Sequence, residues 1–291
     1  MKGFKIFIPL IALTLAGCDV LESGDKLNVY TSFFVMEDLA KKVGGDYVNV
    51  TSIVPSGSEI HSYEPTTGDI RNLSQADLFI YNGAGLEHFI NQLRNAIDNP
   101  NLVYVEASQN IELLSNDDHD DPHVWLSPLN AKKEMENIKR ALIEVDADHS
   151  SYYENRYRLF AEKFDDLHLQ YQTMLLPGVG SYLVTGHAAF GYLANEYDLV
   201  VLPIAGHDSE QEPTQQDIAN IIDIVNQNNI PYIYAESLTP SDAVLTVVEE
   251  TNAELEILYA IEGLSVNQII TNEDYFSLMK DNLFALAKGF I

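Results

Sequence analysis

The sequence predicts an α/β protein of two lobes, each with a mostly parallel sheet flanked by helices, joined by one long rigid helix. Three observations lead to this prediction. Short β-branched runs alternate with helical patterns in both halves of the chain, which is typical of parallel β-α-β units. A run without glycine or proline, residues 150–175, separates the two halves. At 291 residues, the chain also exceeds the usual size of one domain.

Residues 1–18 have the pattern of an export signal. Lys2 and Lys5 precede an apolar stretch, residues 6–15, that is too short to span a bilayer. Leu15-Ala16-Gly17-Cys18 then resembles the bacterial lipobox, in which the cysteine is lipidated and becomes the new N-terminus. The alternative is an ordinary signal peptide with an incidental cysteine. Cys18 is the only cysteine, so an internal disulfide is excluded. We expect removal of the signal and a lipid anchor on Cys18 outside the cytoplasmic membrane.

Residues 19–148 are predicted to form the N-terminal lobe. β-branched or buried apolar runs indicate its strands, at 26–32, 47–54, 76–81 and 102–105. Apolar spacings of three and four indicate its helices, at 35–42, 69–74, 86–96 and 130–145. Pro128 suits the first turn of the last of these helices.

Residues 149–176 are predicted to form the linking helix. Its apolar positions recur at spacings of three and four, at Tyr153, Tyr157, Phe160, Phe164 and Leu167. A helix of about 26 residues is roughly 39 Å long, which is enough to traverse two lobes. Pro177-Gly178 ends it.

Residues 177–291 repeat the alternation and form the predicted C-terminal lobe. The expected strands lie at 182–185, 199–203, 231–235 and 254–258. The expected helices lie at 188–197, 213–228, 241–251 and 275–288.

Charge and missing motifs exclude several functions. A formal net charge of −28 disfavours nucleic acid, because the phosphates would repel such a surface. The stretch from Asn82 to His88 has two glycines but lacks the third glycine of a dinucleotide-binding turn. The phosphate-binding loop of nucleotide hydrolases and the nucleophile elbow of serine hydrolases do not occur either.

Three histidines lie where a predicted strand or stiff segment meets a loop or helix. His61 is central in a polar loop, His123 follows Asp121-Pro122, and His187 follows a strand. Pro122 stiffens the backbone before His123, which suits a ligand whose geometry is set in advance. Ligands of parallel α/β sheets gather at the carboxyl ends of strands, so two facing lobes would bring these residues to one cleft. Taken singly, each histidine is more often structural.

The chain resembles the metal-binding lipoproteins of bacterial ABC importers, the cluster A-I group for zinc and manganese, and more closely the zinc branch. The resemblance covers nearly the whole mature chain and is carried by residues 57–65, 121–128, 186–194 and 258–264. It implies four metal ligands, His61, His123, His187 and Glu262. It also implies a membrane permease as partner, with a separate ATPase, and we expect a monomer that is not an enzyme.

This resemblance has departures. The fourth segment of the family often reads Asn-Pro-Leu-Glu or Asp-Pro-Leu-Gly, but here it is Tyr259-Ala260-Ile261-Glu262, which leaves water as the alternative to Glu262. Zinc members often carry a long histidine-rich loop before the second motif. Here that stretch is short and acidic and holds only His119, which would either load metal transiently or be a solvated loop residue.

Three imidazoles and one carboxylate favour Zn²⁺ in a tetrahedral site, whereas manganese prefers oxygen-rich sites. Glu59, Glu64 and Asp121 are candidate partners for the ring N–H groups of the ligands. The leading interpretation is therefore an extracytoplasmic zinc-capture protein of an ABC importer. The alternatives are a manganese-binding component of the same family, a zinc-dependent hydrolase with an open coordination position, and a surface adhesin.

Overall fold

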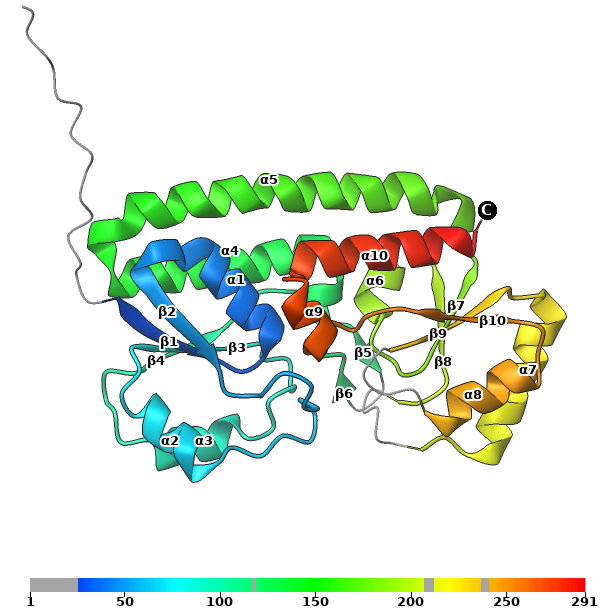
Figure 1. The fold of residues 1–291 in the computed structure, drawn as a ribbon, viewed down its shortest axis with the longest axis horizontal. Coiled ribbons are helices and arrows are strands. Elements are labelled where there is room, and N and C mark those ends of the chain that lie inside the picture. Colours follow the sequence, from blue (N-terminus) through cyan, green and yellow to red (C-terminus); the bar gives the residue numbers. More distant parts are fainter. Residues whose placement is uncertain (1–25, 117–118, 207–211, 237–240, 291) are drawn as a thin grey trace, which may run out of the picture.

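The computed structural model describes residues 26–116, 119–206, 212–236 and 241–290, and contains two parallel four-stranded sheets bridged by one long helix (Figure 1). Cys18 and the rest of the predicted signal lie outside the described residues. Along the part of the chain that is described, no helix is both long and apolar enough to cross a membrane.

The first sheet has the order β2-β1-β3-β4, and all its neighbouring strands are parallel. Its strands are β1 (Leu27–Thr31), β2 (Val48–Ser52), β3 (Leu78–Tyr81) and β4 (Val103–Glu106). Every residue of β3 is buried, as expected for a strand covered on both faces. The accompanying helices are α1 (Phe34–Gly44), α2 (Thr67–Leu73), α3 (Ile90–Ala96) and α4 (Pro128–Val145), with a short hairpin of β5 (Ser115–Asn116) and β6 (His119–Asp120) before α4.

The second sheet has the order β10-β9-β7-β8 and is also parallel. Its strands are β7 (Tyr182–Thr185), β8 (Val200–Pro203), β9 (Tyr232–Ala235) and β10 (Glu254–Ile257). The helices of this half are α6 (Gly191–Glu196), α7 (Gln215–Asn228), α8 (Asp242–Glu249), α9 (Val266–Ile270) and α10 (Tyr275–Lys288).

Helix α5 (Ser150–Leu175) connects the two halves and coincides with the run without glycine or proline. Figure 1 shows it extending over both sheets, with α4 and α10 between it and the strands. Its buried face includes Tyr153, Phe160, Phe164 and Leu167 of the predicted stripe, and it packs against α1, α4 and α10. The predicted fold class is confirmed, while the lobe boundaries at 148 and 176 stay a prediction.

Two helices begin three or four residues later than predicted, because side chains and tight turns occupy their first residues. The helix expected from residue 86 starts at Ile90, since the carboxylate of Glu87 accepts hydrogen bonds from the backbone of Asn82 and Gly83, at 2.8 and 3.0 Å. This closes the glycine turn. The helix expected from residue 188 starts at Gly191. Pro128 does open α4, where the Ser127 hydroxyl accepts from the backbone of Asn130.

Helix α10 makes an ion pair and hydrogen bonds with the first half of the molecule. Lys42 of α1 lies 2.6 Å from Asp38 and 2.8 Å from Asp274, at the start of α10. Tyr275 donates its backbone N–H to Asp38, at 3.1 Å, and its hydroxyl to the backbone oxygen of Trp125, at 2.7 Å. Helix α10 thereby joins elements that are far apart in the sequence.

Candidate metal centre

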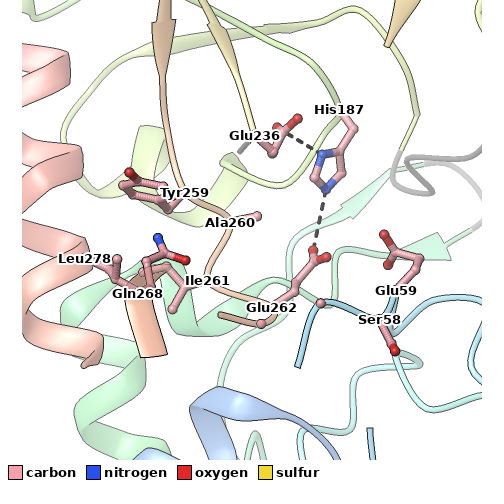
Figure 2. A pocket seen from close by; sticks show the side chains of 12 residues that line it. Ser58, Glu59, His187, Glu236, Tyr259, Ala260, Ile261, Glu262, Gln268 and Leu278 are labelled. Atoms are coloured by element: carbon pink, nitrogen blue, oxygen red, sulfur yellow. Dashed lines mark ion pairs between the residues drawn. The ribbon is translucent and has the colours of Figure 1, made fainter. Parts of the chain in front are cut away.

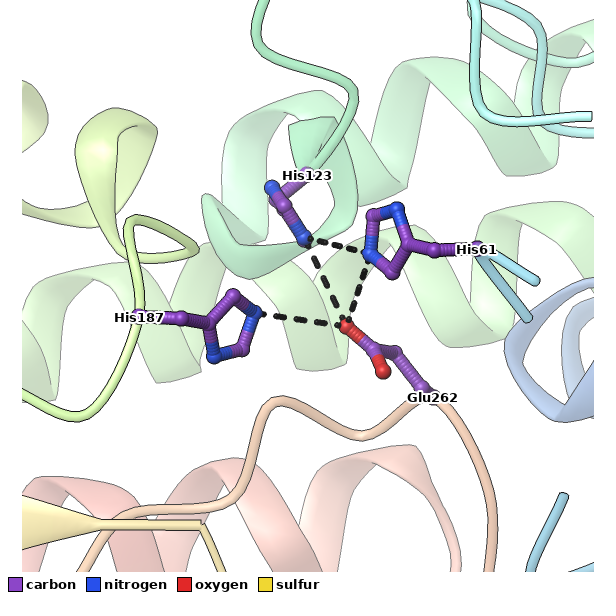
Figure 3. Close-up of side chains that lie close together, drawn as sticks. All are labelled: His61, His123, His187 and Glu262. Carbon is purple, nitrogen blue, oxygen red and sulfur yellow. Dashed lines mark hydrogen bonds and ion pairs between the residues drawn. The ribbon is translucent and has the colours of Figure 1, made fainter. Parts of the chain in front are cut away.

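Four side chains converge between the two sheets: His61, His123, His187 and Glu262 (Figure 3). One potential ligand atom from each lies within 4.8 Å of all the others. The Nε2 atoms of His61 and His123 are 3.2 Å apart. Oε1 of Glu262 lies 3.5 Å from each of these two atoms and 3.7 Å from Nε2 of His187. The predicted convergence is therefore present.

The four residues come from loops whose ends are fixed by secondary structure. His61 lies in the loop between β2 and α2, beside the fully buried Ile60. His187 follows β7 and Glu262 follows β10, so both lie beyond the carboxyl ends of parallel strands, where ligands of such sheets are expected. His123 immediately precedes a turn of 3₁₀ helix, Val124–Leu126, that leads into α4.

Asp121 holds His123 at two points. One carboxylate oxygen, Oδ1, accepts from the backbone N–H of His123 and lies 2.9 Å from its ring Nδ1. The side-chain amide of Asn82 donates to the backbone oxygen of Pro122, at 2.9 Å. The hydroxyl of Tyr192, from α6, donates to the backbone oxygen of Asp121, at 2.7 Å. The His123 loop is therefore braced from both halves of the protein.

Trp125, the only tryptophan, links two of the ligand loops. Its Nε1–H donates to the backbone oxygen of Ala260, two residues before Glu262, at 2.8 Å. Its ring is fully buried and lies 5.3 Å from the His123 ring, centroid to centroid. A displacement of either ligand loop would therefore change the contacts of the Trp125 indole.

The ring of His187 contacts a carboxylate that sequence reasoning missed. Its Nδ1 lies 3.0 Å from Oε1 of Glu236. Glu236 directly follows β9, which pairs with β7 at Thr185 and Tyr234. The sequence signal for this contact is that Glu236 and His187 each come just after a strand. Residues just beyond the ends of paired strands lie close together beside the cleft.

The ionisable groups of the centre shift one another. Burial opposes protonation of His187, but the carboxylates of Glu236 and Glu262 outweigh it and raise its pKa to about 10. Burial likewise opposes protonation of His123, and Asp121 and Glu262 raise its pKa. Burial works to raise the pKa of Glu262, but the three histidines hold it well below its usual range. The centre therefore stabilises the ionised Glu262 with positive charge, which either protonated histidines or a bound cation can supply.

Two atoms that face the centre have no hydrogen-bond partner among the described residues. These are Nε2 of His187 and Oε1 of Glu262, and both are buried. Leaving buried polar atoms unpaired costs about 1–3 kcal/mol each, so such atoms call for a ligand. Imidazole nitrogen and carboxylate oxygen are donors that zinc prefers. The residues present thus fit a bound metal ion.

A small pocket of about 90 Å³ adjoins the centre, and Figure 2 shows His187 at its edge between Glu236 and Glu262. The loop of Gly57, Ser58 and Glu59 lines it from the first half, and residues 259–263 line it from the second. Small-molecule sites usually measure about 300–1,000 Å³. The pocket therefore suits an ion better than an organic substrate.

The remaining predicted residues have other positions. Glu59 accepts from the backbone N–H of His61, at 3.1 Å, and Glu64 lies 3.2 Å from the ring of His88. Of the three candidate partners, Asp121 is the one found against a ligand ring. The backbone of His119 lies in β6, but its side chain, like Cys18, is outside the described part of the structure.

Comparisons with known proteins agree with this geometry. The family model described as "Zinc-uptake complex component A periplasmic" matches residues 29–289. The high-affinity zinc uptake system protein ZnuA of Bacillus subtilis is 36% identical over 278 residues, which cover 90% of this chain and 87% of that protein. The zinc-binding lipoprotein AdcA of Streptococcus pneumoniae is 31% identical over 98% of this chain, which spans only 60% of that longer protein.

A solved structure resembles the chain closely. The Zn(II)-bound ZnuA-like domain of Streptococcus pneumoniae AdcA superposes with a TM-score of 0.81 and 32% identity, covering 91% of this chain and 99% of that domain. The family match, which extends over nearly all the described residues, decides the classification. The chain belongs to the family of the periplasmic component A of zinc-uptake complexes.

Proposed function

We propose that this protein captures Zn²⁺ outside the cytoplasmic membrane and delivers it to the membrane permease of an ABC importer, whose ATPase is a separate protein. The ligands are His61, His123, His187 and Glu262. The observation that carries the proposal is their convergence, with one donor atom of each within 4.8 Å of the others.

The spacing of the donor atoms supports zinc. Zinc–nitrogen and zinc–oxygen bonds of 2.0–2.1 Å in a tetrahedron separate the donors by roughly 3.3 Å. The donor pairs around Glu262 measure 3.5–3.7 Å, and the His61–His123 pair 3.2 Å. The two remaining pairs, which join His187 to His61 and to His123, lie within 4.8 Å, so these rings would have to move closer around the ion. Three imidazoles also make it less oxygen-rich than manganese prefers, so the manganese alternative is disfavoured.

The same donor set argues for capture and against hydrolysis. Catalytic zinc sites keep three protein ligands and an open position for water, whereas four protein ligands close the coordination sphere. With Glu262 as the fourth ligand, no position is left for an activated water. We therefore propose a binding protein and not an enzyme.

The pattern of residues 1–18 supports the proposed location, and the family supports the proposed partner. Cleavage before Cys18 and lipidation of its thiol would anchor the protein to the membrane, beside the permease. His119, in the short acidic stretch before the second ligand motif, would assist loading. We propose a monomer with residues 19–148 and 177–291 as the lobes and 149–176 as their linker. The adhesin alternative stays a prediction.

The decisive experiment is metal analysis of protein purified without chelator, followed by competition titration against a zinc chelator. One equivalent of zinc is expected, with a large loss of affinity in His61→Ala, His123→Ala and His187→Ala. His88→Ala, which changes a histidine outside the centre, is the matched control. Stoichiometric manganese that resists exchange with zinc would overturn the metal assignment, and zinc binding that survives all three substitutions would overturn the site.

A further inference from the structure

Glu236 is a buried carboxylate next to the proposed zinc ligands. Its side chain is only 7% exposed, and Oε1 lies 3.0 Å from Nδ1 of His187. Figure 2 shows the imidazole between two carboxylates, with Glu236 at Nδ1 and Glu262 at Nε2. Glu236 therefore approaches the ring from the side away from the ligand cluster.

The chain makes room for this carboxylate. A Cβ on Gly186 would lie 2.5 Å from Oε2 of Glu236, closer than non-bonded atoms approach. Any larger residue at 186 would therefore displace either the carboxylate or the loop that carries His187. Glycine at 186 therefore leaves the space that the Glu236 carboxylate occupies.

The same arrangement occurs at a second ligand. Nδ1 of His123 lies 2.9 Å from Oδ1 of Asp121, and a Cβ on Gly191 would overlap Oδ2 of that carboxylate. Two of the three histidines thus have a buried carboxylate at Nδ1 and a glycine that accommodates it. In both cases Nε2 is left to face the centre.

We propose that Glu236 is a positioning residue for zinc: it accepts the Nδ1 proton of His187, fixes the tautomer with Nε2 free, and holds the ring toward the ion. A carboxylate at the outer nitrogen also makes the imidazole a stronger donor, and removing such partners typically lowers metal affinity by 10–100-fold. This inference rests on the proposed function, because it assumes that zinc occupies the centre.

The test compares zinc affinities of the full mature chain by chelator competition. We expect Glu236→Ala to bind zinc with an affinity about 10–100-fold lower than the wild type. Glu236→Gln should recover part of this loss, because its amide oxygen still accepts from Nδ1. Glu254→Gln, which removes an exposed carboxylate from the neighbouring strand β10, is the charge-matched control and should bind like the wild type.

A second variant tests the geometry without removing the carboxylate. Gly186→Ala should lower affinity in the wild-type chain, because its methyl group displaces Glu236, but should add no further loss to Glu236→Ala. Nitrogen-15 spectra of the histidine rings in zinc-loaded protein should place the His187 proton on Nδ1, with this preference lost in Glu236→Ala. A merely structural role would leave the tautomer unchanged.

The outcomes separate the two proposals. If the wild type binds no zinc through the four ligands, the proposed function fails before any variant is compared. If the wild type binds zinc but Glu236→Ala stays within about threefold of Glu254→Gln, the positioning role is refuted. It is also refuted if Gly186→Ala lowers affinity by the same factor in both backgrounds.

Discussion

Zinc binding should release protons, because the metal-free centre holds them on its histidines. The carboxylates of Glu236 and Glu262 raise the pKa of His187 to about 10, although its burial opposes this. At pH 7, roughly one molecule in a thousand then has this ring neutral, which costs zinc binding about 4 kcal/mol. Because a ring must be neutral to coordinate, affinity should rise with pH up to about 10. Protonation of His187 alone changes zinc affinity about tenfold per pH unit. Below the raised pKa of His123, protonation of that ring lowers the affinity further.

Calorimetry measures the released protons directly. Titrations at pH 7 in buffers of different ionisation enthalpy give the number of protons as a slope, and we expect between one and two. Chelator competition from pH 8 to pH 6 should show at least a hundredfold loss of affinity, at about 1.4 kcal/mol per pH unit. His187→Ala should lower the proton count by one, whereas the control His88→Ala should leave it unchanged. An affinity that stays constant over this range, with no proton released, would refute the reasoning.

Three further predictions concern single side chains. Glu262→Ala removes one of the four proposed ligands. A whole structural zinc site contributes about 10–16 kcal/mol, so a quarter of it is roughly 3 kcal/mol, or on the order of a hundredfold in affinity. Chelator competition measures it, and an unchanged affinity would indicate water as the fourth ligand. Trp125→Phe leaves the buried oxygen of Ala260 without its donor and should lower the free energy of unfolding by about 1–3 kcal/mol in urea; an equal midpoint would contradict this. Burial, aided by Glu87, raises the pKa of Glu134 well above its usual value, so the carboxyl stabilises the fold most at low pH and this is lost as pH rises above 4.5. Glu134→Gln should therefore gain stability relative to the wild type from pH 5 to pH 8, and a difference that does not change with pH would count against it.

The sequence predicted the fold, and the convergence of the proposed ligands, where pattern and topology coincide. The alternation of strands and helices predicted both sheets, and the spacing of apolar residues predicted helix α5 to within one residue at each end. His187 was predictable because it follows a strand whose carboxyl end must face the cleft. Glu262 depended on family resemblance, because its own segment carries no periodic signal.

Contacts between distant segments were not predictable in the same way. Glu236 contacts His187 because β9 pairs with β7, and that pairing depends on strand order, which periodicity does not reveal. Glu87 was assigned to a helix, but it closes the turn before the helix by accepting from two backbone amides. Glu134 lies on the apolar stripe of α4 between Ala131 and Met135 and is completely buried. The sequence did not predict this burial, because a charged side chain is usually exposed.

The contacts between helix α10 and the first half have a consequence for how the protein unfolds. Asp274 and Tyr275, encoded near the end of the chain, hold Lys42, Asp38 and the backbone of Trp125. A first half made without α10 would lack these partners, so we expect it to fold poorly by itself. Heating should therefore melt both halves in one cooperative step, and a chain truncated before Asp274 should lose the first sheet along with the second.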